Sequence, residues 1–266
     1  MNNVGAYIHI GKIKFMTSMV YRFEFFASIF ASGAIIFSTV FLWKAVYHSL
    51  TKVDGLSEDQ MITYAILSAL LGIIFNVSVE RSMFERILQG DIAIDFIRPT
   101  DILLSYLAED MGIAVSFLIS KFIPMFLLIS LLIYKPVSTG PVSLILFIVS
   151  SILSYMILWL LSALTGILYM KFYDLGNVGF VKDAIIALLS GSIIPIWFFP
   201  QRIKNVLGFL PFQYTYQAPL GIFIGKYSVY EAVVSILIQA VWICMISLGL
   251  IYIWNRFSKN VLIQGG

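Results

Sequence analysis

Residues able to ligate a metal ion or to act as a nucleophile are few in this chain, and they are scattered. There are two histidines, His9 and His48, and one cysteine, Cys244, each far from the others in sequence. A zinc site or a metalloprotease centre needs such ligands grouped at short spacing. We therefore expect no metal site and no catalytic residue in this chain.

A nucleotide-binding loop is not expected either. The closest string to a P-loop is Gly225-Lys226-Tyr227, but Leu220 stands where the loop needs its first glycine. Tyr227 stands where it needs a magnesium-binding serine or threonine. The chain is therefore not expected to hydrolyse ATP by itself or to carry a cofactor of its own.

Polar side chains inside long apolar runs are the remaining candidates for chemistry. Lys121 lies about a dozen residues into such a run, roughly 18 Å along a helix. A charged group at this depth is a functional-site hypothesis by default. Its partner is open, since Asn76, Gln239 or a carboxylate of another subunit could serve. The alternative is a structural pair, or a lysine that faces the dimer cleft without substrate contact.

Two tryptophans, Trp159 and Trp242, also lie near the middle of apolar runs, away from the interfacial positions that tryptophan favours. With Lys121, Asn76 and Gln239 they form a candidate substrate pathway, and packing is their alternative role. The acidic residues fall at or near the ends of the apolar runs instead. This position disfavours a proton- or sodium-coupled carrier.

Membrane helices must position these residues. The chain has 266 residues, of which 60% are hydrophobic and 12% charged, and its net charge is +3. A soluble domain carries about twice that charged share, and so small a charge does not suggest a nucleic-acid partner. Continuous apolar runs indicate helices rather than the alternating strands of a membrane barrel. We predict an all-α integral membrane protein with a single domain, residues 1–266.

Six membrane-spanning helices are predicted. They cover residues 25–46, 61–79, 111–134, 142–170, 184–196 and 229–254. Residues 1–22 alternate polar and apolar side chains and are expected to form an interfacial helix. When this helix is placed inside the cell, most lysines and arginines fall on the cytoplasmic side, which puts both termini there.

Two connecting segments stand out. Residues 80–110 are the most charged stretch, and two interpretations fit them: a solvated loop on the lipid headgroups, or a short helix docked on a cytoplasmic partner. Residues 195–227 are apolar and aromatic but are interrupted by four prolines and three glycines, which will not sustain one helix. We expect a re-entrant hairpin on the outer side, with a plain loop as the alternative.

Four strings, in order and spacing, resemble the permeases of type-2 ABC transporters, and most of all a six-span branch that ends in Gln-Gly-Gly. They are Tyr21-Arg22-Phe23-Glu24-Phe25; Arg86 to Ile92 with Ile97-Arg98-Pro99; Leu189-Ser190-Gly191 to Pro195 with Phe199-Pro200 and Leu210-Pro211-Phe212; and Gln264-Gly265-Gly266. Each string alone is weak, but together they cover nearly the whole chain.

The resemblance implies a half-transporter. Two permease subunits, identical or homologous, would each dock on an ABC ATPase subunit at the cytoplasmic face, so that ATP and Mg²⁺ bind to that partner. Contact with the ATPase is expected at Phe84, Glu85, Ile87, Leu88, Gly90, Asp91, Arg98 and Pro99.

Two further residue sets follow from the resemblance. The outer gate would be formed by Pro195, Phe199, Pro200, Pro211 and Phe212. The family pairs its subunits through spans one and five, so closely spaced small residues there are candidates for the dimer interface, with packing inside one subunit as the alternative. These are Ala27, Ala31, Ala187 and Gly191.

The sequence thus predicts the permease subunit of an ATP-driven exporter in a bacterial cytoplasmic membrane, moving a drug, peptide or lipid-like substrate. Two other classes stay open. An autonomous secondary transporter would work without an ATPase subunit. A membrane-embedded immunity or scaffold component would show no substrate-stimulated ATP hydrolysis.

Overall fold

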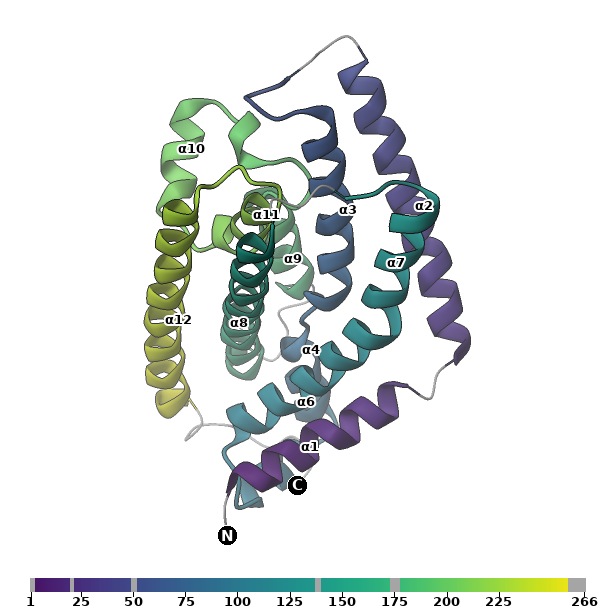
Figure 1. Ribbon diagram of the computed structural model, residues 1–266. Helices are drawn as coiled ribbons and strands as arrows, with labels where there is room; N and C mark the ends of the chain where they lie inside the picture. The colour runs from purple at the N-terminus through teal and green to yellow at the C-terminus, as the bar shows by residue number, and fades with distance from the viewer. Residues whose placement is uncertain (1–2, 20–21, 49–51, 137–139, 173–177, 258–266) are drawn as a thin grey trace.

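The computed structural model describes residues 3–19, 22–48, 52–136, 140–172 and 178–257, and these are folded almost entirely as helices (Figure 1). In chain order the elements are α1 (Asn3–Ser18), α2 (Arg22–Tyr47), α3 (Glu58–Ile74), α4 (Val79–Leu88), α5 (Ile92–Ile97), α6 (Ile102–Phe117), the π-helical turn η1 (Leu118–Phe122), α7 (Ile123–Leu132), α8 (Pro141–Phe172), α9 (Val178–Leu189), the 3₁₀ turn η2 (Ile196–Phe198), α10 (Gln201–Gly208), the 3₁₀ turn η3 (Phe212–Tyr214), α11 (Gln217–Phe223) and α12 (Val229–Phe257).

Five helical stretches in the described part of the chain are long and apolar enough to cross a membrane. They are Ile29–Tyr47, Glu58–Leu88, Ile102–Leu132, Pro141–Leu168 and Val229–Arg256. The predicted all-α, multi-pass class is therefore confirmed, whereas a sixth span is not.

The predicted fifth span, residues 184–196, is wrong in its second half. The corresponding helix, α9, has only 12 described residues and ends at Leu189. The chain then turns at Gly191, whose φ of 83° is a left-handed value that glycine adopts at little cost. Pro195 follows and cannot continue a helix.

α3 is the central helix of the molecule. The stretch that contains it has 67% of its apolar window buried inside the chain, against 17% to 44% for the other four stretches. A capping box starts α3, because the Ser57 hydroxyl accepts from the Gln60 N–H while the Gln60 side chain accepts from the Ser57 N–H. Apolar side chains all around α3 then pack against α2, η1, α6 and α11.

The span that contains α3 is broken, which the predicted span 61–79 did not anticipate. The helix ends at Ile74, and residues 75–78 are not helical before α4 begins. The freed Val77 carbonyl accepts hydrogen bonds from the Lys182 ammonium at 3.0 Å and the Ser162 hydroxyl at 3.3 Å. Side chains from α8 and α9 therefore satisfy a backbone group that a continuous helix would have paired.

The third span begins at Ile102, earlier than the predicted residue 111, because the Asp101 carboxylate caps the helix by accepting from the Leu104 N–H at 2.9 Å. The helix then widens at η1, where the Ile123 N–H bonds to the Leu118 carbonyl five residues back. Pro124 has no N–H to continue the regular ladder, which accounts for the π-helical turn beside it.

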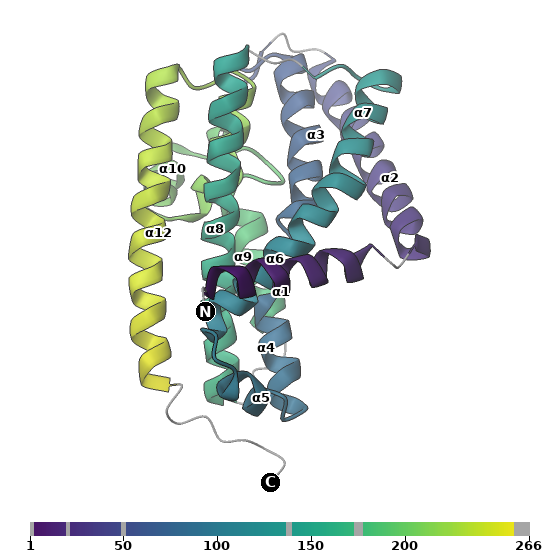
Figure 2. The same ribbon diagram turned by 60° about the horizontal axis from the view of Figure 1, so that its bottom comes forward.

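α1 runs across the axes of the spanning helices and packs on α6 (Figure 2). The two backbones touch at glycines: a Cβ added to Gly112 would lie 2.2 Å from the Gly11 carbonyl oxygen. The Ser18 and Ser116 hydroxyls also hydrogen-bond at 2.7 Å. Small residues thus allow a close crossing. The location of α1 at a membrane interface stays a prediction.

Residues 195–227 form four short helical pieces, η2, α10, η3 and α11, rather than one helix. All seven residues of α11 are buried, and α11 packs mainly on α8. The prolines and glycines therefore break the helix as predicted, whereas the depth of this segment in a membrane stays a prediction.

Candidate functional site

The predicted coupling residues lie on a hairpin of two short helices, α4 and α5, joined at Gly90. Gly90 has a φ of 77°, which reverses the chain direction between them. In Figure 2 the hairpin lies beyond α1, at the same end of the molecule as the lower ends of α8 and α12, and α4 packs on α8. Residues 80–110 are thus mostly helical, so a solvated loop is the wrong local structure for them. Docking of the hairpin on a partner stays a prediction.

This hairpin has a buried and an exposed side. Ile87 and Ile92 are buried, whereas Leu88 and Ile97 are exposed, Ile97 by 83%. Of the predicted contact residues, Phe84 is half-buried, and four besides Leu88 are exposed: Glu85, Asp91, Arg98 and Pro99. Exposed apolar side chains beside charged ones make a surface suited to contact with another protein.

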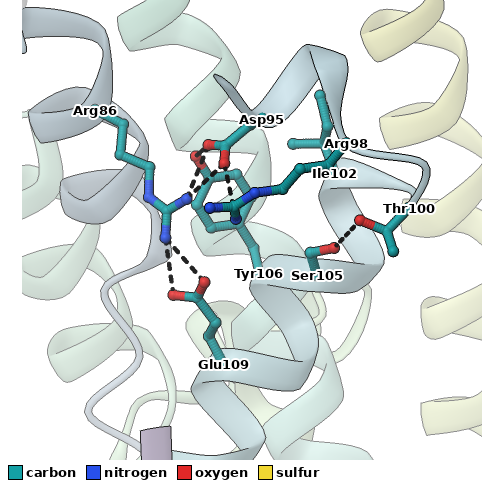
Figure 3. A pocket seen from close by; sticks show the side chains of 8 residues that line it. All are labelled: Arg86, Asp95, Arg98, Thr100, Ile102, Ser105, Tyr106 and Glu109. Atoms are coloured by element: carbon teal, nitrogen blue, oxygen red, sulfur yellow. Dashed lines mark hydrogen bonds and ion pairs between the residues drawn. The ribbon is translucent and has the colours of Figure 1, made fainter. Parts of the chain in front are cut away.

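Arg86 is the hub of an ionic cluster behind the hairpin (Figure 3). Its Nη1 donates to both Asp95 oxygens at 2.7 and 2.9 Å, and its Nη2 donates to both Glu109 oxygens at 2.8 and 3.1 Å. Only 7% of the Asp95 side chain and 11% of the Glu109 side chain are exposed. One terminal nitrogen of the guanidinium thus serves each carboxylate, and these charge-assisted hydrogen bonds join α4, α5 and α6.

Further side chains surround the Arg86 cluster. Tyr106 donates its hydroxyl proton to Asp95 at 3.1 Å, and its ring centroid lies 5.0 Å from the Arg86 guanidinium carbon. Arg98 lies 3.3 Å from Asp95, and Lys14 of α1 lies 3.1 Å from Glu109. Each buried carboxylate therefore has more than one charged or hydrogen-bonding partner.

α5 has a second attachment. The Phe96 ring stacks on Trp254 of α12, with 6.3 Å between ring centroids and 7° between ring planes. A cavity of about 370 Å³ lies beside the ionic cluster, with Lys14, Glu85 and Asp91 among its lining residues. α5 is thus held by Asp95 on one side and by Phe96 on the other, with open space next to it.

The five predicted pathway residues lie on η1, α8, α12 and the break between α3 and α4, and their role in a pathway stays a prediction. Lys121 lies in η1, with its Nζ 4.2 Å from the Phe117 ring centroid. Trp159 is buried, and its indole N–H donates to Asp110 at 3.0 Å, while Trp242 is half-buried on α12.

Gln239 is fully buried and saturated with hydrogen bonds. Its amide group donates to the Tyr214 carbonyl at 2.7 Å, the Ser154 hydroxyl at 3.0 Å and the Ser150 carbonyl at 3.1 Å, and it accepts from the Ser150 hydroxyl at 3.0 Å. These bonds join α8, α12 and η3, so Gln239 holds helices together here. Asn76, in contrast, is exposed at the break between α3 and α4.

A second ionic cluster lies at that break. The Lys182 ammonium contacts Glu80 at 2.8 Å and Asp183 at 3.1 Å, and it donates to the Val77 carbonyl and the Ser162 hydroxyl. Glu80 also accepts from Ser162. Only 10% of the Lys182 side chain and 4% of the Glu80 side chain are exposed.

The predicted gate residues lie around the start of α10 and the start of η3. Pro195 and Pro211 are buried, Phe199 and Phe212 are half-buried, and Pro200 is exposed. The segment is anchored by Gln217, whose side chain accepts from the Ile196 N–H at 2.6 Å and whose own N–H donates to the Ser190 carbonyl at 3.1 Å.

The dimer candidates differ among themselves. Ala31 is exposed on α2, Ala187 is half-buried on α9, and the Ala27 side chain falls outside the described part. Gly191 is buried inside the chain, where its carbonyl accepts from the Tyr64 hydroxyl at 2.6 Å. This contact favours packing within one subunit as the role of Gly191.

Sequence reasoning missed both ionic clusters. One sequence feature could have indicated them: Glu80, Glu109 and Asp183 lie at the ends of apolar runs, where a carboxylate meets a hydrophobic surface. Which cation each one meets depends on how α1, α6 and α9 pack. Among the described residues there is no group of three or more His, Cys, Asp or Glu side chains arranged to hold a metal ion.

The fold and these sites define a multi-pass membrane protein whose charged groups gather at the ends and breaks of its helices. Comparison with known families matches residues 34–262 to the family described as ABC-2 family transporter protein. This match covers most of the chain, so the protein belongs to the ABC-2 transporter family. Membrane subunits of this family are normally the non-catalytic permease of an ABC transporter and act with an ATPase partner. Neither the curated proteins nor the solved structures give a significant match.

Proposed function

We propose that this protein is the permease subunit of an ATP-driven exporter in a bacterial cytoplasmic membrane. Two such subunits, alike or homologous, each bind an ABC ATPase, which holds ATP and Mg²⁺. In this proposal both termini are cytoplasmic, and α9 belongs to a further span, the fifth of six in chain order. The segment 195–227 enters the membrane from outside as a gate, and the chain belongs to the branch that ends in Gln-Gly-Gly.

The observation that carries this proposal is the two-sided attachment of α5. Ile97 at its end is exposed and free to contact an ATPase, whereas Asp95 and Phe96 tie α5 to the spanning helices. A push on the exposed side reaches α4 and α6 through Arg86, and it reaches α12 through Trp254. This geometry suits a coupling element that converts closure of two motors into helix movement.

The proposal is tested by replacing Ile97 with Asp in the permease and co-purifying it with an ABC ATPase encoded beside it. Loss of the exposed apolar contact should reduce ATPase recovery at least about tenfold, as expected for an interface anchor. The matched control is Tyr230→Asp, because Tyr230 is 79% exposed but lies in the first turn of α12, outside the hairpin and the proposed gate. We expect this control to retain the ATPase.

Two results would overturn the proposal. One is equal ATPase recovery with the Ile97 and Tyr230 variants, which would move the docking surface elsewhere. The other is the absence of any associated ATPase together with transport that continues after ATP depletion, which would make the protein a secondary transporter. Substrate-stimulated, vanadate-sensitive ATP hydrolysis by the reconstituted complex would exclude a scaffold that transports nothing.

A further inference from the structure

A polar pocket of about 250 Å³ lies where two backbone breaks meet. One break is residues 75–78 between α3 and α4, and the other is the turn that follows α9. Asn76, Ser192 and Tyr216 line the pocket together with Lys182 and Asp183. Broken helices at membrane depth place polar groups around ligands in many transporters.

Two uncharged groups in this pocket have open hydrogen-bonding capacity. The Tyr216 residue is 8% exposed, and its hydroxyl faces the pocket beside Gly72. Within the described part of the chain, neither this hydroxyl nor the Asn76 amide has a hydrogen-bond partner. Because the Tyr216 hydroxyl opens onto the pocket, it can donate to or accept from a ligand there.

The charges at the pocket have a net negative sum. Lys182 contributes one positive charge, and Glu80 and Asp183 contribute two negative charges. The Lys182 ammonium already contacts four oxygen-bearing groups, so it has little capacity left for an anion. Asp183 pairs with Lys182 within the described residues and has 63% of its side chain exposed, so its carboxylate is open to a cation.

The remaining wall is apolar. Leu158 and Ile186 line it, and the Phe75 ring packs edge-on against the Tyr216 ring at 5.2 Å between centroids. An apolar wall with a few convergent polar groups is the usual form of a small-molecule site. The ligand that fits is one with an ammonium group and an apolar body.

We infer that this pocket binds the ammonium group of an amphipathic amine, with Asp183 as the counter-ion and Asn76 and Tyr216 as hydrogen-bond partners. If the protein is the proposed permease, this amine is its substrate class, and only that step of the inference rests on the proposed function. Binding itself requires neither ATP nor the ATPase subunit.

The test uses the full-length permease in nanodiscs of zwitterionic lipid, without nucleotide. The probe is a dansylated alkylamine with a free primary amine, and its N-acetylated derivative is the matched neutral probe. Empty nanodiscs correct for partition into lipid. We expect the amine to bind at least about tenfold more tightly than the neutral probe, as for a charge-assisted hydrogen bond.

Three variants separate binding from folding. Asp183→Asn should abolish the preference for the amine, and Tyr216→Phe should weaken amine binding by about three- to tenfold. Asn76→Asp adds a negative charge and should strengthen amine binding by about two- to fivefold, an effect that misfolding cannot produce. Asp54→Asn is the control, because Asp54 is an exposed carboxylate in the loop before α3 with a φ of 52° that asparagine tolerates.

Equal binding of the amine and its neutral derivative would overturn the inference, as would an unchanged preference in Asp183→Asn. A complex that hydrolyses ATP but does not prefer the amine would contradict this inference alone. A permease that prefers the amine but recruits no ATPase would contradict the proposed function alone.

Discussion

The Arg86 cluster and the Gln239 cluster both join helices of this protein, but they differ in charge. The Arg86 cluster joins α1, α4, α5 and α6 through ion pairs, with 21% of the arginine side chain exposed. The Gln239 cluster joins α8, α12 and η3 through neutral hydrogen bonds, and none of its glutamine is exposed. The Arg86 cluster supports the α4–α5 hairpin, whereas the Gln239 cluster supports α8 and α12, two of the longest helices.

This difference shows which part of the molecule can change its contacts. Asp95 can keep a charged partner during a movement, since Arg86 and Arg98 both reach it, and Glu109 has both Arg86 and Lys14. Gln239 has one set of partners with fixed geometry. A charged cluster with alternative partners suits a moving element, and a saturated neutral one suits a static frame.

The strongest way to break this comparison is Arg86→Met. Removing the arginine leaves Asp95 and Glu109 buried with weaker partners, which should cost about 3–5 kcal/mol of unfolding free energy. Thermal unfolding in detergent measures the loss. Arg81→Met is the control, because its ion pair with Glu85 is exposed and should change stability little. Equal losses in both variants would show that the buried cluster stabilises the protein no more than an exposed ion pair does.

The neutral cluster is tested by Gln239→Leu. The variant leaves the Tyr214 and Ser150 carbonyls without this donor, at a cost of about 2 kcal/mol. The same unfolding measurement applies, with Met245→Leu at an exposed position of α12 as the control. ATP hydrolysis per folded complex should stay unchanged. A selective loss of ATP hydrolysis would contradict a purely supporting role.

Gly112→Ala tests whether α1 belongs to the charged cluster. The added methyl group would collide with the Gly11 carbonyl, and overpacking of this kind costs about 1–3 kcal/mol. A disulfide between cysteines placed at Ser18 and Ser116, in a chain lacking Cys244, should form readily in the parent and poorly in the variant. Gly33→Ala is the control, since its Cβ meets nothing within 4 Å. Equal cross-linking would refute the close crossing.

The smallest effect is expected from Phe96→Ala. This variant removes the stack on Trp254 and should cost about 1 kcal/mol of stability. Its larger consequence should be a weaker response of ATP hydrolysis to substrate, because α5 loses its link to α12. Tyr230→Ala is the control on another exposed ring, outside the hairpin and the proposed gate. An unchanged response would exclude the Phe96–Trp254 stack as a route from the hairpin to α12.

Much of the architecture follows from residue order alone. Long apolar runs require helices in lipid, because no water is present there to satisfy an open backbone. The prolines between Pro195 and Pro219 interrupt residues 195–227 wherever they lie, since proline lacks the N–H that a helix needs. Gly90 likewise separates α4 from α5, and Pro99 follows the end of α5, so the place of the hairpin in the chain could be predicted.

Tertiary structure decided the rest. Local pattern gives no reason for α3 to stop at Ile74, and the break is tolerated because Lys182 and Ser162 bond to the Val77 carbonyl. α9 is shorter than its apolar run because the chain turns into contact with Tyr64 and Gln217. The sequence by itself determined a helical membrane protein of this family. Only packing decided which charges meet, because Arg86 finds Glu109, and Lys182 finds Glu80, across distances in sequence that no local rule spans.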